Sequence, residues 1–168
     1  MEQINAYERV DFKAIQSGFL CPTRSRPLPI ATINDTYGRY ESGGWSWAKT
    51  DFAANFLVVP NLPRVFSPSS ITDGLSNTLL VEEKAYDRLI HTSSTSFWDE
   101  PIFSGGSQGT ARDGFALVPD GDKYEFKHNW GSAHSGVHFL LCDCSVELVS
   151  FDVDWRIFAS RCTQNKAD

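Results

Sequence analysis

The sequence lacks any long hydrophobic run. No apolar stretch approaches the roughly 20 residues that a membrane-spanning helix requires. The first residues, MEQINAYERVDFKAIQ, are polar and do not have the pattern of a secretory signal peptide. We therefore expect a soluble chain without a membrane span, and an export signal would have to lie upstream of Met1.

The sequence also lacks clustered positive charge. It carries 15 basic and 21 acidic residues, for a net charge of −6, and no run of Lys and Arg is longer than two residues. Binding to a phosphate backbone requires a basic patch that neutralises several phosphates at once. The charge pattern therefore predicts that nucleic acid is not a partner.

Cysteine is scarce and is not arranged as a metal knuckle. The chain has Cys21, Cys142, Cys144 and Cys162, and no Cys-x-x-Cys pair. A structural zinc knuckle therefore has little support. Four thiols could form two disulfides in three connectivities, or some of them could be small buried apolar side chains. Both alternatives remain open at this point.

Local signatures of catalysis are weak. No phosphate-binding glycine loop is present, and Cys21 has no catalytic motif around it. No set of residues meets the geometric requirements of an active site. We therefore expect a protein that is not an enzyme.

What the sequence does contain is the pattern of one α+β domain over residues 1–168. Ile4, Tyr7, Phe12 and Ile15 predict a helix over 2–17, which Gly18 ends. Long loops that carry aromatic and acidic side chains are expected over 23–47 and 91–136. The other expected elements are strands at 19–21, 50–59, 77–86, 137–142 and 145–151, and a short helix at 154–162. This order predicts an N-terminal helix packed on an antiparallel sheet.

Several segments, taken in order, resemble one family. They are EQINAY, FLCPTRSRP, AKTDFAAN, ITDGLSNTLLVEEK, WGSAH and FLLCDCSVELVSFDVD. This series is similar to the prepilin-associated H-X9-DG proteins, a domain of unknown function (1559) that is also labelled a bacterial solute-binding family. The resemblance covers about residues 2–161. It implies a secreted, extracytoplasmic protein with a pseudopilin-like globular domain.

The chain departs from that family pattern in two ways. The apolar helix and prepilin cleavage signal with which the family typically begins are absent from the sequence as given. The signature histidine maps to His134 and its aspartate to Asp143, with eight residues between them instead of nine, and Cys144 stands in place of the glycine. At about 3.3 Å per residue, His134 and Asp143 would lie roughly 25–30 Å apart at opposite ends of one strand. We favour structural roles for both, although a histidine near a carboxylate could bind a metal or act as a base.

Loop residues supply the remaining candidates for binding. Trp45, Trp98 and Trp130 could stack on a sugar or anchor a partner, and they could equally pack the loops onto the sheet. Acidic loop residues could provide the oxygen ligands of calcium, which pseudopilin domains often hold, although no EF-hand spacing is present. These acidic candidates are Asp99, Asp113, Asp120 and Asp122.

The segment 70–78 is dense in polar side chains, including Asp73 and Asn77. Such groups can bind a ligand, but we favour the interpretation that they satisfy backbone groups of a loop, as Asp143 would in its turn. The leading hypothesis is thus a non-enzymatic domain acting in envelope assembly or surface interaction, with self-assembly as one form of partnership. The alternative is a module that binds a small solute or glycan, with calcium as a candidate cofactor.

Overall fold

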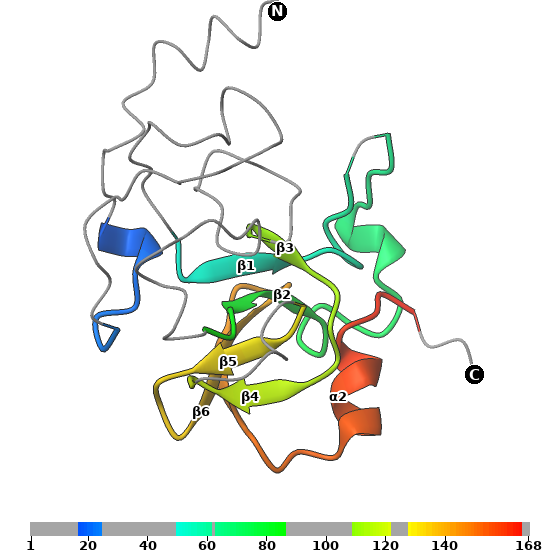
Figure 1. Ribbon diagram of the computed structural model, residues 1–168. Coiled ribbons are helices and arrows are strands. Elements are labelled where there is room, and N and C mark those ends of the chain that lie inside the picture. The colour runs from blue at the N-terminus through cyan, green and yellow to red at the C-terminus, as the bar shows by residue number, and fades with distance from the viewer. Residues whose placement is uncertain (1–16, 25–49, 62, 87–108, 122–127, 166–168) are drawn as a thin grey trace, which may run out of the picture.

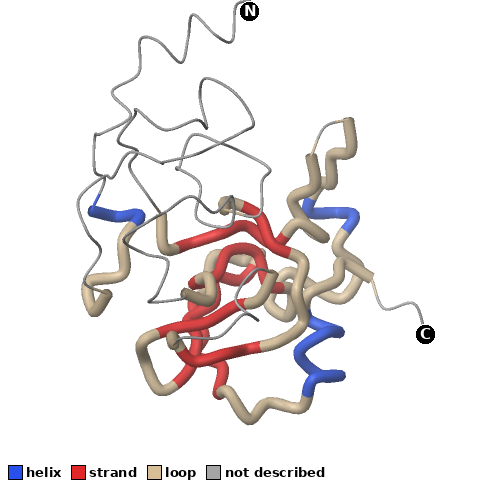
Figure 2. The backbone as a smooth tube through the Cα atoms, in the orientation of Figure 1, coloured by secondary structure: helices blue, strands red, loops and turns tan. Residues whose placement is uncertain are grey.

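The computed structural model describes residues 17–24, 50–61, 63–86, 109–121 and 128–165 (Figure 1). The helix expected over 2–17 lies outside the described residues except for Ser17. Figure 2 shows the strands gathered at the centre, with the helical segments around them. Within the described part of the chain, no helix is long and apolar enough to cross a membrane.

The central element is a five-stranded sheet of order β3-β1-β2-β6-β7. Its strands are β1 (Phe52–Asn55), β2 (Leu79–Glu83), β3 (Ala111–Arg112), β6 (Gly136–Leu141) and β7 (Val146–Ser150). The β1–β2, β2–β6 and β6–β7 pairs are antiparallel, as expected, but β3 pairs with β1 in parallel. The sheet is therefore mixed, and the fully antiparallel sheet expected from the sequence was wrong at this edge.

Four short elements differ from the sequence expectation. Residues 17–19 form a 3-10 helix, η1 (Ser17–Phe19), and no strand covers 19–21. Within the segment expected to be loop, β3, β4 (Leu117–Pro119) and β5 (Trp130–Ser132) are strands of two or three residues, and β4 pairs with β5 in parallel. Strands this short contain too few residues for a period of two to be visible in the sequence.

β1 is shorter than the predicted strand 50–59 because Asn55 ends it. The Asn55 side-chain oxygen accepts from Leu57 N (3.1 Å), and its carbonyl accepts from the backbone amides of Val58 and Val59. The Asn55 amide donates to the carbonyls of Leu79 and Cys162. This buried side chain thus connects the end of β1 to β2 and to the C-terminal part of the chain.

The hydrophobic core lies between the sheet, β5 and the C-terminal helix α2 (Trp155–Arg161), at the lower right of Figure 1. Asp154 caps this helix by accepting from Arg156 N at 2.8 Å. Phe139 of β6 and Phe158 of α2 meet edge to face, with ring centroids 5.5 Å apart. The fully buried core side chains are Leu79, Trp130, Val137, Phe139 and Phe158.

Neighbouring residues of β2 point to opposite faces of the sheet. Glu82 is opposite Phe139 in the register and is completely buried on the core side. Neither of its carboxylate oxygens has a hydrogen-bond partner, and burial raises the pKa of this carboxyl well above its usual value. The protonated form is therefore the one that the folded core favours.

We predict that the free energy of unfolding contains a component that falls as pH rises, and that Glu82→Gln removes it. The unfolded chain releases the Glu82 proton near pH 4.3 while the folded chain retains it. The unfolded state then binds fewer protons, so this component falls by up to about 1.4 kcal/mol per pH unit between the two pKa values. Urea unfolding between pH 4 and pH 8 measures it.

Glu147 provides a control of opposite sign. Its pKa is lowered, first of all by the hydrogen bonds from Arg161, so its contribution is present above the unfolded pKa and is lost as pH falls. Glu147→Gln should therefore differ from the parent at neutral pH and converge with it in acid. Identical pH profiles for Glu82→Gln and the parent would contradict the assignment of Glu82.

Candidate functional site

Four side chains from distant parts of the sequence meet at one end of the sheet. Cys21 follows η1, Glu83 ends β2, His134 precedes β6 and His138 lies within β6. Glu83 is directed to the face opposite Glu82, and its side chain is only 3% exposed. Cys21 is buried, whereas the side chains of His134 and His138 are 28% and 46% exposed. The cluster is therefore buried at Cys21 and Glu83 and open to solvent at the two histidines.

The contacts of this cluster converge on one ring nitrogen. His134 Nε2 lies 3.4 Å from Cys21 Sγ and 3.6 Å from Glu83 Oε1. Thr23 Oγ1 is 3.3 Å from the same nitrogen. The ligand atoms of Cys21, Glu83 and His134 all lie within 4.8 Å of one another, and within the described ranges this is the group of side chains suited to hold a metal ion.

His138 completes the cluster through the second oxygen of Glu83. Its Nδ1 lies 3.4 Å from Glu83 Oε2, and its backbone amide donates to the same oxygen at 3.2 Å. The rings of His134 and His138 meet at 84° with centroids 5.2 Å apart. His138 thus lies on one face of β6 and joins the cluster through Glu83.

A buried arginine fixes the position of Cys21. The Arg24 guanidinium donates two hydrogen bonds, of 2.7 and 2.8 Å, to the two carboxylate oxygens of Asp120. It also donates to the backbone carbonyls of Lys84 and Gly131. Its guanidinium also lies 3.4 Å from the Asp51 carboxylate, which accepts from Cys21 N at 2.7 Å. The segment 21–24 is thus held on the sheet by charge-assisted hydrogen bonds.

This arrangement differs from a nucleophile relay. In a thiol–imidazole–carboxylate relay, one ring nitrogen faces the nucleophile and the other faces the acid. Here the Cys21 thiol and the Glu83 carboxylate both face Nε2 of His134. The geometry is suited to a cation that all three atoms share.

The letters GGSQG over 105–109 match a nucleophile elbow, but they lie outside the described residues except for Gly109.

The acidic residues considered for calcium have other partners where they are described. Asp120 binds the buried Arg24, and Asp113 contacts His128 Nδ1 at 2.9 Å. Asp99 and Asp122 lie outside the described residues. The structure therefore does not bring Asp113 and Asp120 together as one metal group.

Of the three tryptophans considered for ligand binding, one lies within the described residues and two lie outside them. Trp130 is fully buried in the core, and its indole N–H donates to Gly114 O at 2.8 Å. Trp45 and Trp98 lie outside the described residues. Trp130 thus packs a loop onto the sheet, which is one of the two roles that we considered for these aromatics.

Side chains of the polar segment 70–78 donate hydrogen bonds to backbone carbonyls of the same segment. Asn77 Nδ2 donates to Asp73 O at 3.0 Å, and Thr78 Oγ1 donates to Gly74 O at 3.1 Å. Gly74 has a φ of 94°, which suits the predicted Asp-Gly turn. These contacts agree with a loop-satisfying role for the Asn77 side chain, whereas Asp73 takes part through its backbone carbonyl.

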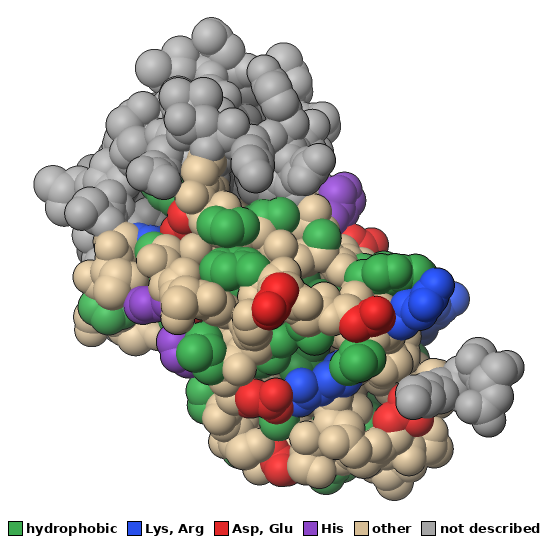
Figure 3. Space-filling view, turned by 90° about the horizontal axis from the view of Figure 1, so that it is seen from below, with side chains coloured by type: hydrophobic (Ala, Val, Ile, Leu, Met, Phe, Trp, Pro, Cys, Tyr) green, Lys and Arg blue, Asp and Glu red, His purple; other side chains and the backbone are tan. Residues whose placement is uncertain are grey.

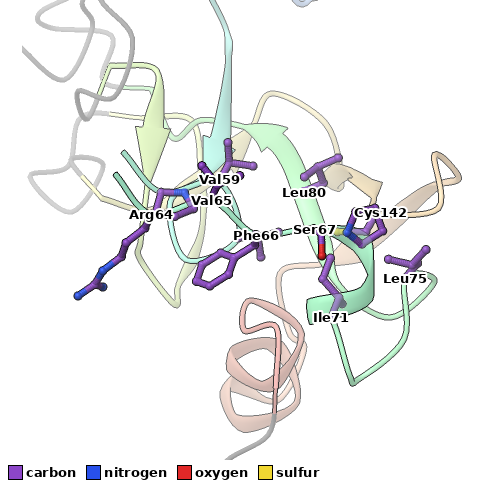
Figure 4. A pocket seen from close by; sticks show the side chains of 12 residues that line it. Val59, Arg64, Val65, Phe66, Ser67, Ile71, Leu75, Leu80 and Cys142 are labelled. Carbon is purple, nitrogen blue, oxygen red and sulfur yellow. The ribbon is translucent and has the colours of Figure 1, made fainter. Parts of the chain in front are cut away.

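An apolar pocket of about 340 Å³ opens beside this segment (Figure 4). Figure 4 shows Val59, Arg64 and Val65 toward the left of the view, and Ile71, Leu75, Leu80 and Cys142 toward the right. Trp130, the one described tryptophan of the three considered for ligand binding, does not line the pocket. None of the four side chains of the Cys21 cluster lines this pocket, so the two are separate features. The segment 63–75, which supplies much of the lining, lies on the opposite side of Figure 1 from η1. The described residues that line the pocket are Val58, Val59, Pro60, Arg64, Val65, Phe66, Ser67, Pro68, Ile71, Leu75, Leu80 and Cys142.

All four cysteines are free thiols, so the disulfide alternative is not realised in this structure. Cys21 and Cys162 are buried, and burial raises the pKa of Cys162 strongly. Cys144 is exposed at the tip of the β6–β7 hairpin. Two of the thiols thus serve as small buried side chains, as the second alternative proposed.

The signature positions His134 and Asp143 lie before and after β6 and take part in different contacts. Asp143 Oδ1 accepts from Ser145 N (2.9 Å) and Ser145 Oγ (2.6 Å), which lowers the pKa of Asp143. Cys144, which replaces the family glycine, has a φ of 70°. Cys144 N donates to Leu141 O, and Leu141 N to Ser145 O, as in a three-residue hairpin loop with a left-handed last residue.

Comparison with known proteins gives one match. A family model described as "Protein of unknown function (DUF1559)" matches residues 1–156. No curated protein and no solved structure matches the chain. The match confirms the resemblance to domain of unknown function 1559 that the ordered segments indicated.

We predict that Cys144→Gly stabilises the protein by about 0.5–1 kcal/mol. A side chain at positive φ is strained by roughly 1–2 kcal/mol, and part of the gain is offset by the greater freedom of glycine in the unfolded chain. Urea unfolding in reductant measures the change. Cys144→Ala is the control, because it removes the thiol but leaves the strain. A destabilised Cys144→Gly protein, or an equal gain with alanine, would show that φ at this position is not the cause.

Proposed function

The chain belongs to the DUF1559 family, and on that premise we propose that it is a non-enzymatic, pseudopilin-like domain that acts outside the cytoplasm in envelope or surface assembly. Its mode of action in this proposal is binding to another protein, either a surface protein or a second copy of itself. The family resemblance of the ordered segments implies the pseudopilin-like fold and the extracytoplasmic location, and the spacing of apolar residues predicts the N-terminal helix over 2–17.

The observation that carries this proposal is the outer face of the β6–β7 hairpin. In the register, His138 is opposite Leu148, and Leu140 is opposite Val146. These four residues share the face that points away from the core. Val146 is 66% exposed and Leu148 is 51% exposed. Such side chains side by side on one strand form an apolar contact surface.

The position of β7 in the sheet adds the backbone hydrogen-bonding groups of an edge strand to this apolar surface. Among the described strands, β7 is the last in the sheet and pairs only with β6. An apolar edge strand readily adds a strand from another chain, and natural monomers usually protect such edges with charges. On the face shown in Figure 3, acidic and basic side chains are scattered among hydrophobic ones, without a contiguous basic area. This agrees with a protein partner in place of nucleic acid.

We predict that the protein self-associates through β7 and that Leu148→Lys weakens the association at least tenfold, or about 1.4 kcal/mol. A lysine on the outer face of an edge strand disfavours pairing with a second strand. Sedimentation velocity over a range of concentrations measures the dissociation constant. Val65→Lys is the matched control, because Val65 is also exposed (76%) but lies at the apolar pocket. A parent protein that stays monomeric, or equal effects of both lysines, would contradict self-assembly through β7.

The pocket of Figure 4 favours a second candidate, a module that binds a small apolar solute. Its volume falls within the range of ligand pockets, and its walls are mainly aliphatic with a few polar groups such as Arg64 and Ser67. A glycan receives less support, because the described lining offers no tryptophan platform. Calcium-assisted binding likewise receives less support, because no acidic residue is among the described residues that line this pocket.

We predict that an environment-sensitive apolar dye binds in this pocket and that Ile71→Lys abolishes its fluorescence increase. The charge would have to be buried beside the dye at a cost that the contact cannot offset. Ile157→Lys on α2 is the control, because this residue is exposed (59%) and does not line the pocket. Retained fluorescence in Ile71→Lys would remove the solute-binding candidate.

A further inference from the structure

We propose that Cys21, Glu83 and His134 form a binding site for a divalent transition metal ion, zinc in particular. The inference does not depend on the proposed interaction function, because it concerns a different set of atoms from the pocket and the outer face of β7. It rests on the positions of three ligand atoms that come from three separate segments of the chain.

The distances between these atoms match the edges of a zinc coordination polyhedron. Zinc binds thiolate sulfur at about 2.3 Å and imidazole nitrogen or carboxylate oxygen at about 2.0–2.2 Å. With tetrahedral angles, these bond lengths give ligand-to-ligand separations of about 3.3–3.6 Å. The sulfur–nitrogen separation here is 3.4 Å and the oxygen–nitrogen separation is 3.6 Å. Two of the three separations thus already match those of zinc ligands, and the third, between the ligand atoms of Cys21 and Glu83, is no more than 4.8 Å.

Several polar atoms converge on one ring nitrogen of this cluster. Nε2 of a histidine carries at most one hydrogen. Around Nε2 of His134, however, Cys21 Sγ, Thr23 Oγ1 and Glu83 Oε1 all lie within 3.6 Å. One hydrogen can be directed to one of these atoms, whereas a cation beside the nitrogen can be shared by all of them.

The kinds of ligand atom select the metal. A thiolate with an imidazole and one carboxylate is a set typical of zinc and its neighbours in the transition series. Calcium and magnesium prefer sites made entirely of oxygen atoms. The site therefore differs in both place and chemistry from the calcium site considered at the acidic loops.

The surrounding residues hold the ligands in place before a metal binds. Asp51 accepts from Cys21 N, which fixes the cysteine backbone. The oxygen of Glu83 that does not face His134 is held by the backbone amide and Nδ1 of His138. Such outer contacts orient ligands and raise metal affinity.

Three protein ligands leave a fourth position of the tetrahedron for solvent. Thr23 Oγ1 lies 3.3 Å from Nε2 and 3.0 Å from Cys21 Sγ, beside that remaining corner. We assign the fourth position to a water molecule that this hydroxyl can hydrogen-bond. Zinc binding replaces the thiol proton of Cys21, which passes to solvent, so affinity rises with pH.

The test is titration of the reduced, metal-free full chain with Co²⁺, followed by displacement with Zn²⁺. We expect one equivalent of Co²⁺ to produce the near-ultraviolet charge-transfer absorption of a thiolate–cobalt bond, and Zn²⁺ to abolish it. The melting temperature should rise with zinc concentration, because a ligand that binds the folded state stabilises it.

Variants assign the site to these residues. Cys21→Ser should remove the charge-transfer absorption, and His134→Gln should lower zinc affinity at least tenfold. His134 is partly exposed, so this second variant keeps the test valid should Cys21→Ser fail to fold. Cys144→Ser and His128→Gln are matched controls, because these residues are also a cysteine and a histidine but lie outside the cluster.

Two outcomes would overturn the proposal. One is a parent protein that gives no thiolate–cobalt absorption and no rise in melting temperature with zinc. The other is absorption that survives in Cys21→Ser but disappears in Cys144→Ser, which would place the metal at the hairpin tip. Sedimentation velocity with a chelator present keeps the test of association through β7 independent of both outcomes.

Discussion

The buried guanidinium of Arg24 is the interaction on which the rest of the site depends. Its side chain is 2% exposed, and it contacts the carboxylates of Asp51 and Asp120. It also donates to carbonyls beyond the end of β2 and within β5. Removing one partner from such a buried group typically costs about 3–5 kcal/mol, because the remaining charges lose their compensation. This network keeps Cys21 within reach of His134, although 113 residues separate them in the sequence.

The alternation of side chains along β2 determines the chemistry of two adjacent glutamates. Glu82 enters the core beside α2, where its carboxyl has no hydrogen-bond partner among the described residues and burial raises its pKa. Glu83 faces the other side, where two histidines and a cysteine surround it. A strand places successive side chains on opposite faces of the sheet. Of two adjacent glutamates, one therefore enters the core, where its carboxyl is destabilising, and the other lies on the face where it can bind a cation. A register slip of β2 would exchange the two roles.

The sequence predicted those parts of the fold that local patterns encode. The β6–β7 hairpin and α2 were expected within one residue of their observed bounds, because alternation and the Asp154 cap mark them. The strands β3, β4 and β5 were not expected, since their pairing depends on contacts with distant segments. For the site, His134 was a candidate, but its partners Cys21 and Glu83 were not. Their convergence arises from the tertiary contacts of Arg24, which no spacing in the sequence reveals.

The cluster and the outer face of the hairpin are adjacent through one cross-strand pair. His138 contacts Glu83 and lies opposite Leu148, so a chain that pairs with β7 would lie one strand away from the cluster. Binding at one place can then affect the other only through β6, because the two share no other described contact. A cation held by Glu83 would fix one of its oxygens and leave the other to His138, whose ring is half exposed beside the apolar surface. Since coupling between two ligands requires a group whose arrangement both of them influence, His138 is the residue through which metal binding and strand pairing would be linked.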